Sequence, residues 1–395
     1  MKRANRLLST PPYHFARWTE RVEAVQRQSV DVIRLDIGNP DMPPPDEVIE
    51  TLYQSARQSS HHGYSGYRGL PVLREAIAGY YERRFGVSLD PESQVVPLIG
   101  SKEGIVHIAL ACLDPGDLVL VPDPGYAPYT MGASLAGAEV YTFPLLAERG
   151  FLPDLDAIPA DVADRAVLMW LNYPNNPTGA TADLEFLAQA VDFARNHDLL
   201  LCHDAPYCDV TYDGYVAPSL LQVDSASEVA IEFNSLSKTY NMAGWRVGMA
   251  VGNADALAAL AQVKSNLNTG LFHPLQEAAV RALSIAPEWL SERNEIYRER
   301  LDIVVEELNA AGMEVSCPRA TLYAWVRVGP GWASSEQFVL ALLEQAGVAV
   351  ASGSFFGPAG EGYARISVTA PTKRVQEAME RVRRFLTSPL VSLDS

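Results

Sequence analysis

Short apolar runs alternate with stretches of helical periodicity along most of the chain. Six runs are apolar on both faces and end in turn residues; they are Val95–Ile99, Leu118–Val121, Val167–Leu171, Leu199–Cys202, Val229–Phe233 and Val247–Val251. Helical patterns lie between several of them, such as Gly104–Leu113 and Asp183–Asn196. This alternation indicates an α/β fold with a mostly parallel sheet covered on both sides. Ligands of such sheets bind at the carboxyl ends of the strands, which directs attention to the residues just beyond each run.

The pattern differs at the two ends of the chain. A helix over Pro71–Phe85 is predicted before the first strand, with one face made of Val72, Leu73, Ile77 and Tyr80. After a long helical stretch, Pro287–Ala311, the pattern predicts a smaller α+β domain with strands Tyr323–Val328, Val348–Ala351 and Ala364–Val368 and helices Phe338–Gln345 and Thr372–Leu386. The segment up to about Pro45 is predicted to be irregular, and its closing prolines make it an extended crossing segment. The predicted divisions are residues 1–45, 46–285 and 286–395.

Composition and charge narrow the class of protein. Apolar residues make up 48% of the 395 residues and charged residues 20%, which excludes a disordered chain, a collagen-like chain and a coiled coil. The net charge of −17 argues against a nucleic-acid surface, which needs basic groups to neutralise phosphates. No apolar run is long enough for a transmembrane helix and no secretory signal is evident, so no membrane partner and a cytoplasmic location are expected. Four cysteines without a CxxC pair predict reduced thiols, and no metal site is expected, because Cys202 and His203 have no second ligand pair.

The strongest candidate for chemistry is Lys238, in a segment between two apolar strands. Ser235 and Ser237 precede it, and Arg246 follows eight residues later. A desolvated lysine near other cations has a lowered pKa and can form a Schiff base with an aldehyde cofactor. Hydroxyl groups and a guanidinium suit a phosphate. The alternative is a lysine in a surface loop beside an unrelated arginine.

Two further motifs follow predicted strands. Asp204 ends a buried strand, where a carboxylate needs a partner such as a protonated pyridine nitrogen, and Tyr207 lies three residues on. Asn176 lies in the turn-rich stretch Leu171–Gly179. Asn176 and Tyr207 could both donate to a ring phenolate oxygen and so lower the pKa of a Schiff base. The alternatives are a helix-capping aspartate and ordinary turn chemistry.

Three more positions are weaker candidates. Gly100–Gly104, with Ser101 and Lys102, opens a helix after a strand, and helix N-termini bind phosphate. Tyr126 follows another strand and could stack on a flat ring, although core packing is the usual role of tyrosine. Arg365 lies within a strand of the smaller domain, where a substrate carboxylate is a natural partner and a solvated edge position is the alternative.

Together these residues resemble the fold-type I pyridoxal-phosphate enzymes, specifically the class I and II aminotransferases. The ordered set of motifs spans Gly38 to Arg365, nearly the whole chain. The resemblance implies an aspartate aminotransferase-like fold, with a large cofactor-binding domain built on a seven-stranded sheet and a smaller domain that the N-terminal segment joins. It implies that Lys238 holds pyridoxal 5'-phosphate and moves the substrate Cα proton, while Asp204 pairs with the pyridine nitrogen. The other implied cofactor-binding residues are Asn176 and Tyr207 at the phenolate oxygen, Tyr126 on the ring, and Ser101, Lys102, Ser235 and Arg246 at the phosphate.

The resemblance also implies a substrate site and a partner. Arg365 would bind the substrate α-carboxylate, with the Gly38 backbone and Asn176 alongside. The stretch Tyr64-x-x-x-x-Gly69-x-x-x-Leu73-Arg74 matches the family, where the tyrosine typically reaches the phosphate of the neighbouring subunit, so a homodimer with shared active sites is expected. Asn266 is expected to face the partner's site.

Within the family, the chain is most similar to the LL-diaminopimelate aminotransferases, on the segment Pro11–Ala16 that contains Tyr13 and on Gly100–Gly104, Pro122–Tyr126 and Ser235–Gly248. This similarity implies transamination between LL-diaminopimelate or glutamate and 2-oxoglutarate, in lysine biosynthesis, and places Tyr13 among the substrate-binding residues. One departure is that Tyr67 and Arg68 stand where some members carry an acidic residue. The alternatives are an aspartate- or alanine-type aminotransferase and a carbon–sulfur β-lyase. A regulator domain is disfavoured, because no room precedes Pro11–Tyr13 for a DNA-binding module.

Overall fold

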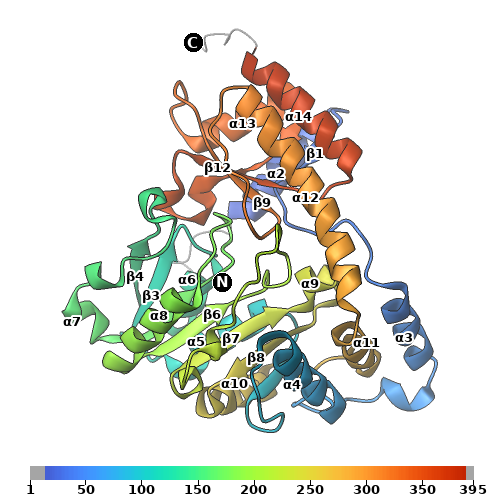
Figure 1. Cartoon of the computed structure of the whole chain (residues 1–395), viewed down its shortest axis with the longest axis vertical. Coiled ribbons are helices and arrows are strands. Elements are labelled where there is room, and N and C mark those ends of the chain that lie inside the picture. The colour runs from blue at the N-terminus through green and yellow to red at the C-terminus, as the bar shows by residue number, and fades with distance from the viewer. Residues whose placement is uncertain (1–13, 388–395) are drawn as a thin grey trace, which may run out of the picture.

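The computed structural model describes residues 14–387. A broad sheet with flanking helices forms the lower body in Figure 1, and a smaller group of strands and helices lies above it. The long helix α12 (Pro287–Ala310) runs between the two bodies. The functional residues described below lie where these bodies meet.

The lower body is built on a seven-stranded, mostly parallel sheet, as predicted. Along the sheet the strands are β2 (Val95–Leu98), β8 (Gly248–Gly252), β7 (Ala230–Ser235), β6 (Leu200–Asp204), β5 (Ala166–Leu171), β3 (Leu118–Asp123) and β4 (Glu139–Pro144). Only β8 runs antiparallel to its neighbours. Six strands match the predicted apolar runs. The seventh, β4, is an edge strand with exposed polar positions, so the chain has no continuous apolar run there.

Helices cover both faces of this sheet, because successive strand residues point to opposite faces. Val119 and Val121 pack on one face with α5 (Ser101–Cys112), α6 (Pro128–Ala136) and α10 (Ala254–Leu267). Leu120 points to the other face, which is covered by α3 (Asp46–Ala56), α4 (Pro71–Phe85), α8 (Leu184–Asn196) and α11 (His273–Leu283). The predicted face of α4 is corrected at one position: Leu73, Ile77 and Tyr80 are buried, but Val72 is 46% exposed.

The upper body combines both ends of the chain. It contains a three-stranded antiparallel sheet in the order β11 (Ala351–Ser352), β12 (Tyr363–Ser367) and β9 (Tyr323–Arg327). A parallel pair joins β1 (Ile33–Arg34) to β10 (Val348–Ala349). The strand predicted over Val348–Ala351 is therefore two short strands with different partners. The helices of this body are α2 (His14–Gln26), α13 (Ser335–Ala346), α14 (Thr372–Thr387) and most of α12.

The N-terminal segment is only partly irregular, which corrects the prediction. Helix α2 forms because Trp18, Val22 and Val25 make an apolar stripe that is buried in the core of the upper body. The following stretch is extended as predicted, and Asp41 is held by a 2.7 Å ion pair with Arg300 of α12. The segment thus contacts later parts of the chain through the β1–β10 pair and the Asp41–Arg300 ion pair.

The remaining elements are short. They are the helices α7 (Ala160–Ala163) and α9 (Leu236–Thr239) and the 3₁₀ turns η1 (Ser59–His62), η2 (Ala147–Arg149), η3 (Leu155–Ala157), η4 (Leu220–Gln222), η5 (Ala226–Glu228), η6 (Ala243–Trp245), η7 (Gly353–Phe356) and η8 (Pro358–Gly360). Across residues 14–387, every helix is too short or too polar to cross a bilayer.

Candidate active site

A cavity of about 670 Å³ lies between the carboxyl ends of the parallel strands and the upper body. Most of the predicted site residues line it: Gly38, Ser101, Lys102, Tyr126, Asn176, Asp204, Tyr207, Ser235, Lys238, Arg246 and Arg365. They come together because several of them follow parallel strands that end at the same edge of the sheet.

Lys238 projects into this cavity from α9, the short helix that follows β7. Ser235 caps the helix, its Oγ accepting a 3.2 Å hydrogen bond from the backbone nitrogen of Ser237. The Lys238 Nζ donates to the carbonyl oxygen of Gly38. Burial, together with the positive charges of Arg365 and Arg246, lowers the pKa of Lys238 to about 7. An amine with such a pKa can exchange a proton near neutral pH.

Asp204 ends β6 and is buried beneath the cavity. Its Oδ2 accepts a 2.8 Å hydrogen bond from the hydroxyl of Tyr129. Its Oδ1 is buried and has no hydrogen-bond partner among residues 14–387. Burial raises the pKa of Asp204 to about 6, although the Tyr129 hydrogen bond opposes the rise. The Tyr129 ring is stacked on Trp170, with 4.6 Å between centroids and 12° between planes.

Arg365 is held at the opposite side of the cavity by contacts from three parts of the chain. Its guanidinium donates to Asn176 Oδ1 at 2.7 Å and to the Asp36 carbonyl oxygen at 2.6 Å. It lies 4.2 Å from the ring centroid of Tyr323, within cation–π range. The Tyr323 hydroxyl hydrogen-bonds that of Tyr207 at 2.8 Å. The predicted residues Asn176 and Tyr207 therefore belong to one network with Arg365.

Positive groups gather at the N-terminus of α5. Gly100 precedes this helix with a φ of +75°, and a Cβ at that position would lie 2.2 Å from Arg246 Nη2. Ser101 and Lys102 form the first turn of the helix. Burial and the Arg246 charge lower the pKa of Lys102. Two cations beside the positive end of a helix form a site for an anion such as phosphate.

Glycine at position 38 is required by close packing. A Cβ there would lie 1.9 Å from the hydroxyl oxygen of Tyr323. The backbone of Gly38 therefore approaches both Tyr323 and the amine of Lys238. This close approach explains why position 38 is a glycine.

Two predicted residues do not line the cavity of their own chain, and a third lies outside the described residues. Tyr64 lies in the segment after η1 with 91% of its surface exposed. Asn266 is on α10, and its Nδ2 donates to the Gln262 carbonyl oxygen at 2.9 Å. Tyr13 lies outside the described residues. The predicted roles of these three residues stay predictions.

The structure adds residues that sequence reasoning missed. Tyr129 holds Asp204, Tyr323 stacks on Arg365, and Phe15 and Phe356 line the same side of the cavity. Asn172 donates to the Asp204 carbonyl oxygen at 2.6 Å and accepts from the Asn176 backbone nitrogen at 2.8 Å. The place of Asn172 directly after a strand could have identified it. Nothing in the sequence distinguishes Tyr129 or Tyr323 from core aromatic residues.

Comparison with known proteins places this arrangement in a family. The model of the aminotransferase class I and II family matches residues 30–382. An LL-diaminopimelate aminotransferase of Moorella thermoacetica is 52% identical over 386 residues, which cover 98% of this chain and 99% of the relative. One from Desulforudis audaxviator is 51% identical, with 97% of each chain covered.

Solved structures show the same fold. BacF of Bacillus subtilis, solved with bound substrate, superposes with a TM-score of 0.94 at 37% identity, and 98% of each chain is covered. A probable N-succinyldiaminopimelate aminotransferase of Thermus thermophilus superposes with a TM-score of 0.88 at 38% identity over 94% of this chain and 99% of that one.

The donor set of the cavity fits pyridoxal 5'-phosphate. The unpartnered Oδ1 of Asp204 is an acceptor suited to a protonated ring nitrogen, and the amine of Lys238 suits an aldehyde. The cations at the start of α5 suit a phosphate, and Tyr126 presents an aromatic ring beside Tyr129. The match over residues 30–382, the near full-length relatives and the shared fold show that the chain belongs to the class I and II aminotransferases, enzymes that depend on pyridoxal phosphate.

Proposed function

We propose that this aminotransferase moves an amino group between LL-diaminopimelate and 2-oxoglutarate, with glutamate as the amino acid formed from 2-oxoglutarate, as a step of lysine biosynthesis. The assignment of this substrate rests on the similarity to proteins named LL-diaminopimelate aminotransferase. Two of them are 52% and 51% identical over almost the whole chain. Solved relatives that are 30–38% identical have other names, including aspartate and aromatic aminotransferases, so the higher identity favours this substrate.

Lys238 carries the proton in this proposal. The bound cofactor supplies an electron sink for the charge that develops at the substrate Cα. The Nζ of Lys238 takes the proton from that carbon and returns one in the reverse half of the cycle. Its pKa of about 7 supports this role, because a neutral amine is needed to accept the proton and burial favours the neutral form.

Asp204 and Arg365 act at opposite sides of the cavity. The unpartnered Oδ1 of Asp204 would hold a proton on the cofactor's ring nitrogen and so would keep the ring electron-poor. Arg365 binds the substrate α-carboxylate; its contacts with Asn176 and the Asp36 carbonyl hold the guanidinium in one orientation before substrate arrives. Fixed orientation lowers the entropic cost of binding.

The remaining predicted residues orient the cofactor. Asn176 and Tyr207 would donate to the cofactor's phenolate oxygen, and Tyr126 would stack on its ring. The phosphate is held at the start of α5 by Ser101, Lys102, Ser235 and Arg246. Their presence in the lining of one cavity with Lys238 and Asp204 supports these assignments.

We propose that the enzyme is a cytoplasmic homodimer with shared active sites. Tyr64 supports this proposal, because a tyrosine that is 91% exposed makes few contacts within its own chain. In the dimer, Tyr64 reaches the partner's phosphate site and Asn266 faces the partner's cavity. Mixing Lys238→Ala and Tyr64→Ala chains tests the arrangement, since each hybrid dimer would contain one intact site and regain activity. No recovery in verified hybrids would refute site sharing.

The distal end of the substrate is the least specified part of the site. Within one chain, Asp204 is the one carboxylate among the described residues that line the cavity. Arg68 does not point into the cavity but binds the backbone and carboxylate of Glu92. Recognition of the distal ammonium of diaminopimelate therefore relies on neutral polar groups or on the partner subunit.

Single-donor assays test the substrate. The purified enzyme, loaded with cofactor, is given 2-oxoglutarate and one amino acid at a time, and glutamate formation is measured. We expect LL-diaminopimelate to have the highest kcat/KM. A higher kcat/KM for aspartate or alanine would show that LL-diaminopimelate is not the preferred substrate. Release of pyruvate and ammonia from cystathionine without glutamate formation would favour a β-lyase.

A further inference from the structure

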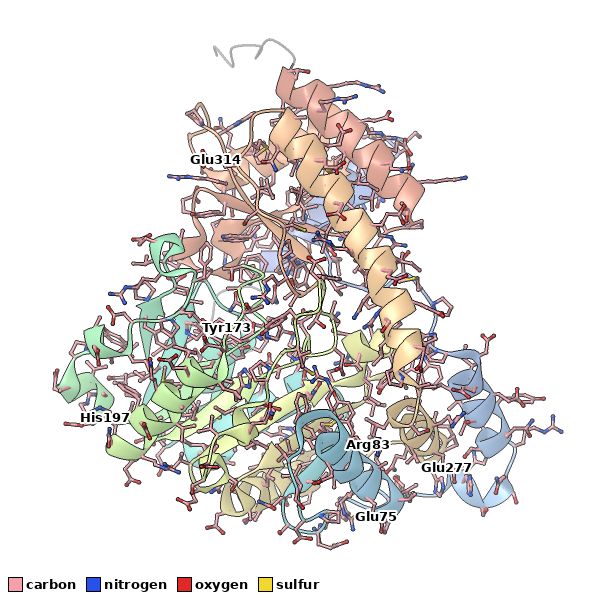
Figure 2. All side chains as sticks on the ribbon, in the orientation of Figure 1. Glu75, Arg83, Tyr173, His197, Glu277 and Glu314 are labelled. Carbon is pink, nitrogen blue, oxygen red and sulfur yellow. The ribbon has the colours of Figure 1, made fainter. Side chains whose placement is uncertain are left out.

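A compact polar cluster lies outside the active-site cavity, where η1 packs beside α11. It contains His61 of η1 together with His273 and Glu277, one turn apart on α11. Ser55, at the end of α3, completes it. The side chains of His61, His273 and Glu277 are 14%, 22% and 33% exposed, so they are ordered by packing but remain open to a small ion. Glu277 marks this corner of the molecule in Figure 2.

The potential ligand atoms of this cluster converge. One nitrogen of each histidine and one oxygen of Glu277 lie within 4.8 Å of one another. His273 Nε2 is 3.2 Å from Glu277 Oε1, and His61 Nδ1 is 3.8 Å from Glu277 Oε2. Ser55 Oγ is 2.9 Å from His61 Nδ1. The imidazole rings are stacked, with 3.8 Å between centroids.

We propose that His61, His273 and Glu277 form a binding site for a divalent transition-metal ion, with Zn²⁺ as the best match. Two imidazoles and a carboxylate are a common zinc ligand set, with water or the Ser55 hydroxyl in the fourth position. Ligand atoms about 2.1 Å from a tetrahedral zinc ion lie roughly 3.4 Å apart. The ligand atoms here lie within 4.8 Å of one another, so small side-chain movements would bring them to that spacing. The rings must tilt from their stacked arrangement, which the broad χ2 torsion of histidine permits.

The position of the site indicates a structural role. Gln276, on the same side of α11, accepts from the Leu70 backbone nitrogen at 2.7 Å and donates to Ser65 Oγ at 3.0 Å. Gln276 of α11 therefore already binds residues near the end of the 59–70 segment. A metal ion bound to His61 would also attach the start of this segment to α11. The segment carries Tyr64. The effect of the metal ion on Tyr64 rests on the proposed dimer, whereas metal binding itself does not.

Zinc binding to the full-length, cofactor-loaded enzyme tests the site. The protein, prepared without an affinity tag, is treated with a chelator, dialysed, and titrated with Zn²⁺ alone by calorimetry. We compare the original chain with His61→Asn, His273→Gln and Glu277→Gln. The matched control is His197→Asn, because His197 also contacts a carboxylate, 2.6 Å away on Asp164. In Figure 2, His197 lies at the left of the molecule and Glu277 at the right.

We expect about one Zn²⁺ per chain in the original protein and in the control, with a dissociation constant at least ~tenfold higher in each cluster variant. Zinc should also slow protease cleavage within the 59–70 segment in the original protein and in the His197→Asn control, but not in the cluster variants. Equal affinity in the original chain and in His273→Gln, or no uptake above one-tenth of an ion per chain, would overturn the site. Thermal unfolding checks that each variant is folded, and the substrate assays above are read separately, so failure of one proposal does not imply failure of the other.

Discussion

Tyr129→Phe isolates one buried hydrogen bond from the rest of the site. Tyr129 donates to Asp204 Oδ2 at 2.8 Å, and the remainder of its ring is stacked on Trp170. Burial and the nearby Asp204 carboxylate raise the pKa of Tyr129 well above its usual range, so the hydroxyl stays protonated and remains a donor. Phenylalanine keeps the stacking and removes only this donor.

The magnitude follows from the charge on the acceptor. A hydrogen bond to an ionised group contributes about 1.5–3 kcal/mol, equivalent to roughly one to two pKa units. The pKa of Asp204 without cofactor is about 6, raised by burial and opposed by Tyr129. In the variant it should rise to roughly 7–8. At pH 7 the ionised fraction of Asp204 would fall from about 0.9 to about 0.1–0.5, so this fraction would decrease roughly twofold to tenfold.

The dissociation constant of pyridoxal phosphate, measured from pH 5.5 to 9, reports this change. Asp204 must be ionised to pair with a protonated ring nitrogen, so affinity falls as the pH drops through its pKa. The ratio of variant to original dissociation constant should grow below about pH 8, because other titrations are common to both proteins. Tyr212→Phe is the control, since it removes a buried hydroxyl that donates to the Thr321 carbonyl, away from Asp204.

A ratio that is constant with pH would refute the reasoning. It would mean that Tyr129 does not stabilise the ionised form of Asp204. A similar pH-dependent ratio for Tyr212→Phe would also refute it, because the effect would then follow from general loss of stability.

The remaining predictions address other parts of the site. Lys238→Ala should lower kcat by at least ~10²-fold in single-turnover assays with bound cofactor, because the group that moves the proton is lost; near-normal turnover would contradict the role. Arg365→Lys should raise KM for amino acids by about tenfold to a hundredfold in steady-state assays, because a forked carboxylate contact is lost. In the cofactor-free folded protein the pKa of Lys238 is about 7, whereas in the unfolded chain it is about 10.4. Between these two pH values the unfolded chain therefore binds more protons than the folded protein. Stability should therefore rise with pH across that window in urea unfolding, and an equal slope in Lys238→Met would contradict the assignment. Gly38→Ala should impair folding or activity, measured by melting temperature and turnover, because its Cβ would overlap the Tyr323 hydroxyl.

Much of the fold and the site could be predicted from the sequence for a local reason. Strands such as Val119–Val121 are apolar at successive positions because both faces of the sheet are covered, and this pattern is visible without coordinates. Lys238, Asp204 and Asn176 each follow such a strand, and parallel strands bring their carboxyl ends together.

Other features could not be predicted because the sequence pattern is weak there. Strand β4 lies at the sheet edge, where exposed positions interrupt the apolar run. Helix α2 is different, because the spacing of Trp18, Val22 and Val25 is a sequence signal for a helix, and the prediction of an irregular segment there is wrong. The short strands β10 and β11 are separate only because they pair with different partners, β1 and β12.

The sequence by itself determined the alternation of strands and helices, the family and the residue types available for chemistry, because these depend on local periodicity and ordered motifs. Only the tertiary structure decided which side chains meet. The hydrogen bond from Tyr129 to Asp204 joins residues 75 positions apart, and Arg365 reaches Asn176 across 189 positions. His61 meets Glu277 across an even longer interval. Such contacts depend on how packed elements bring distant parts of the chain together, and no local pattern of amino acids encodes that distance.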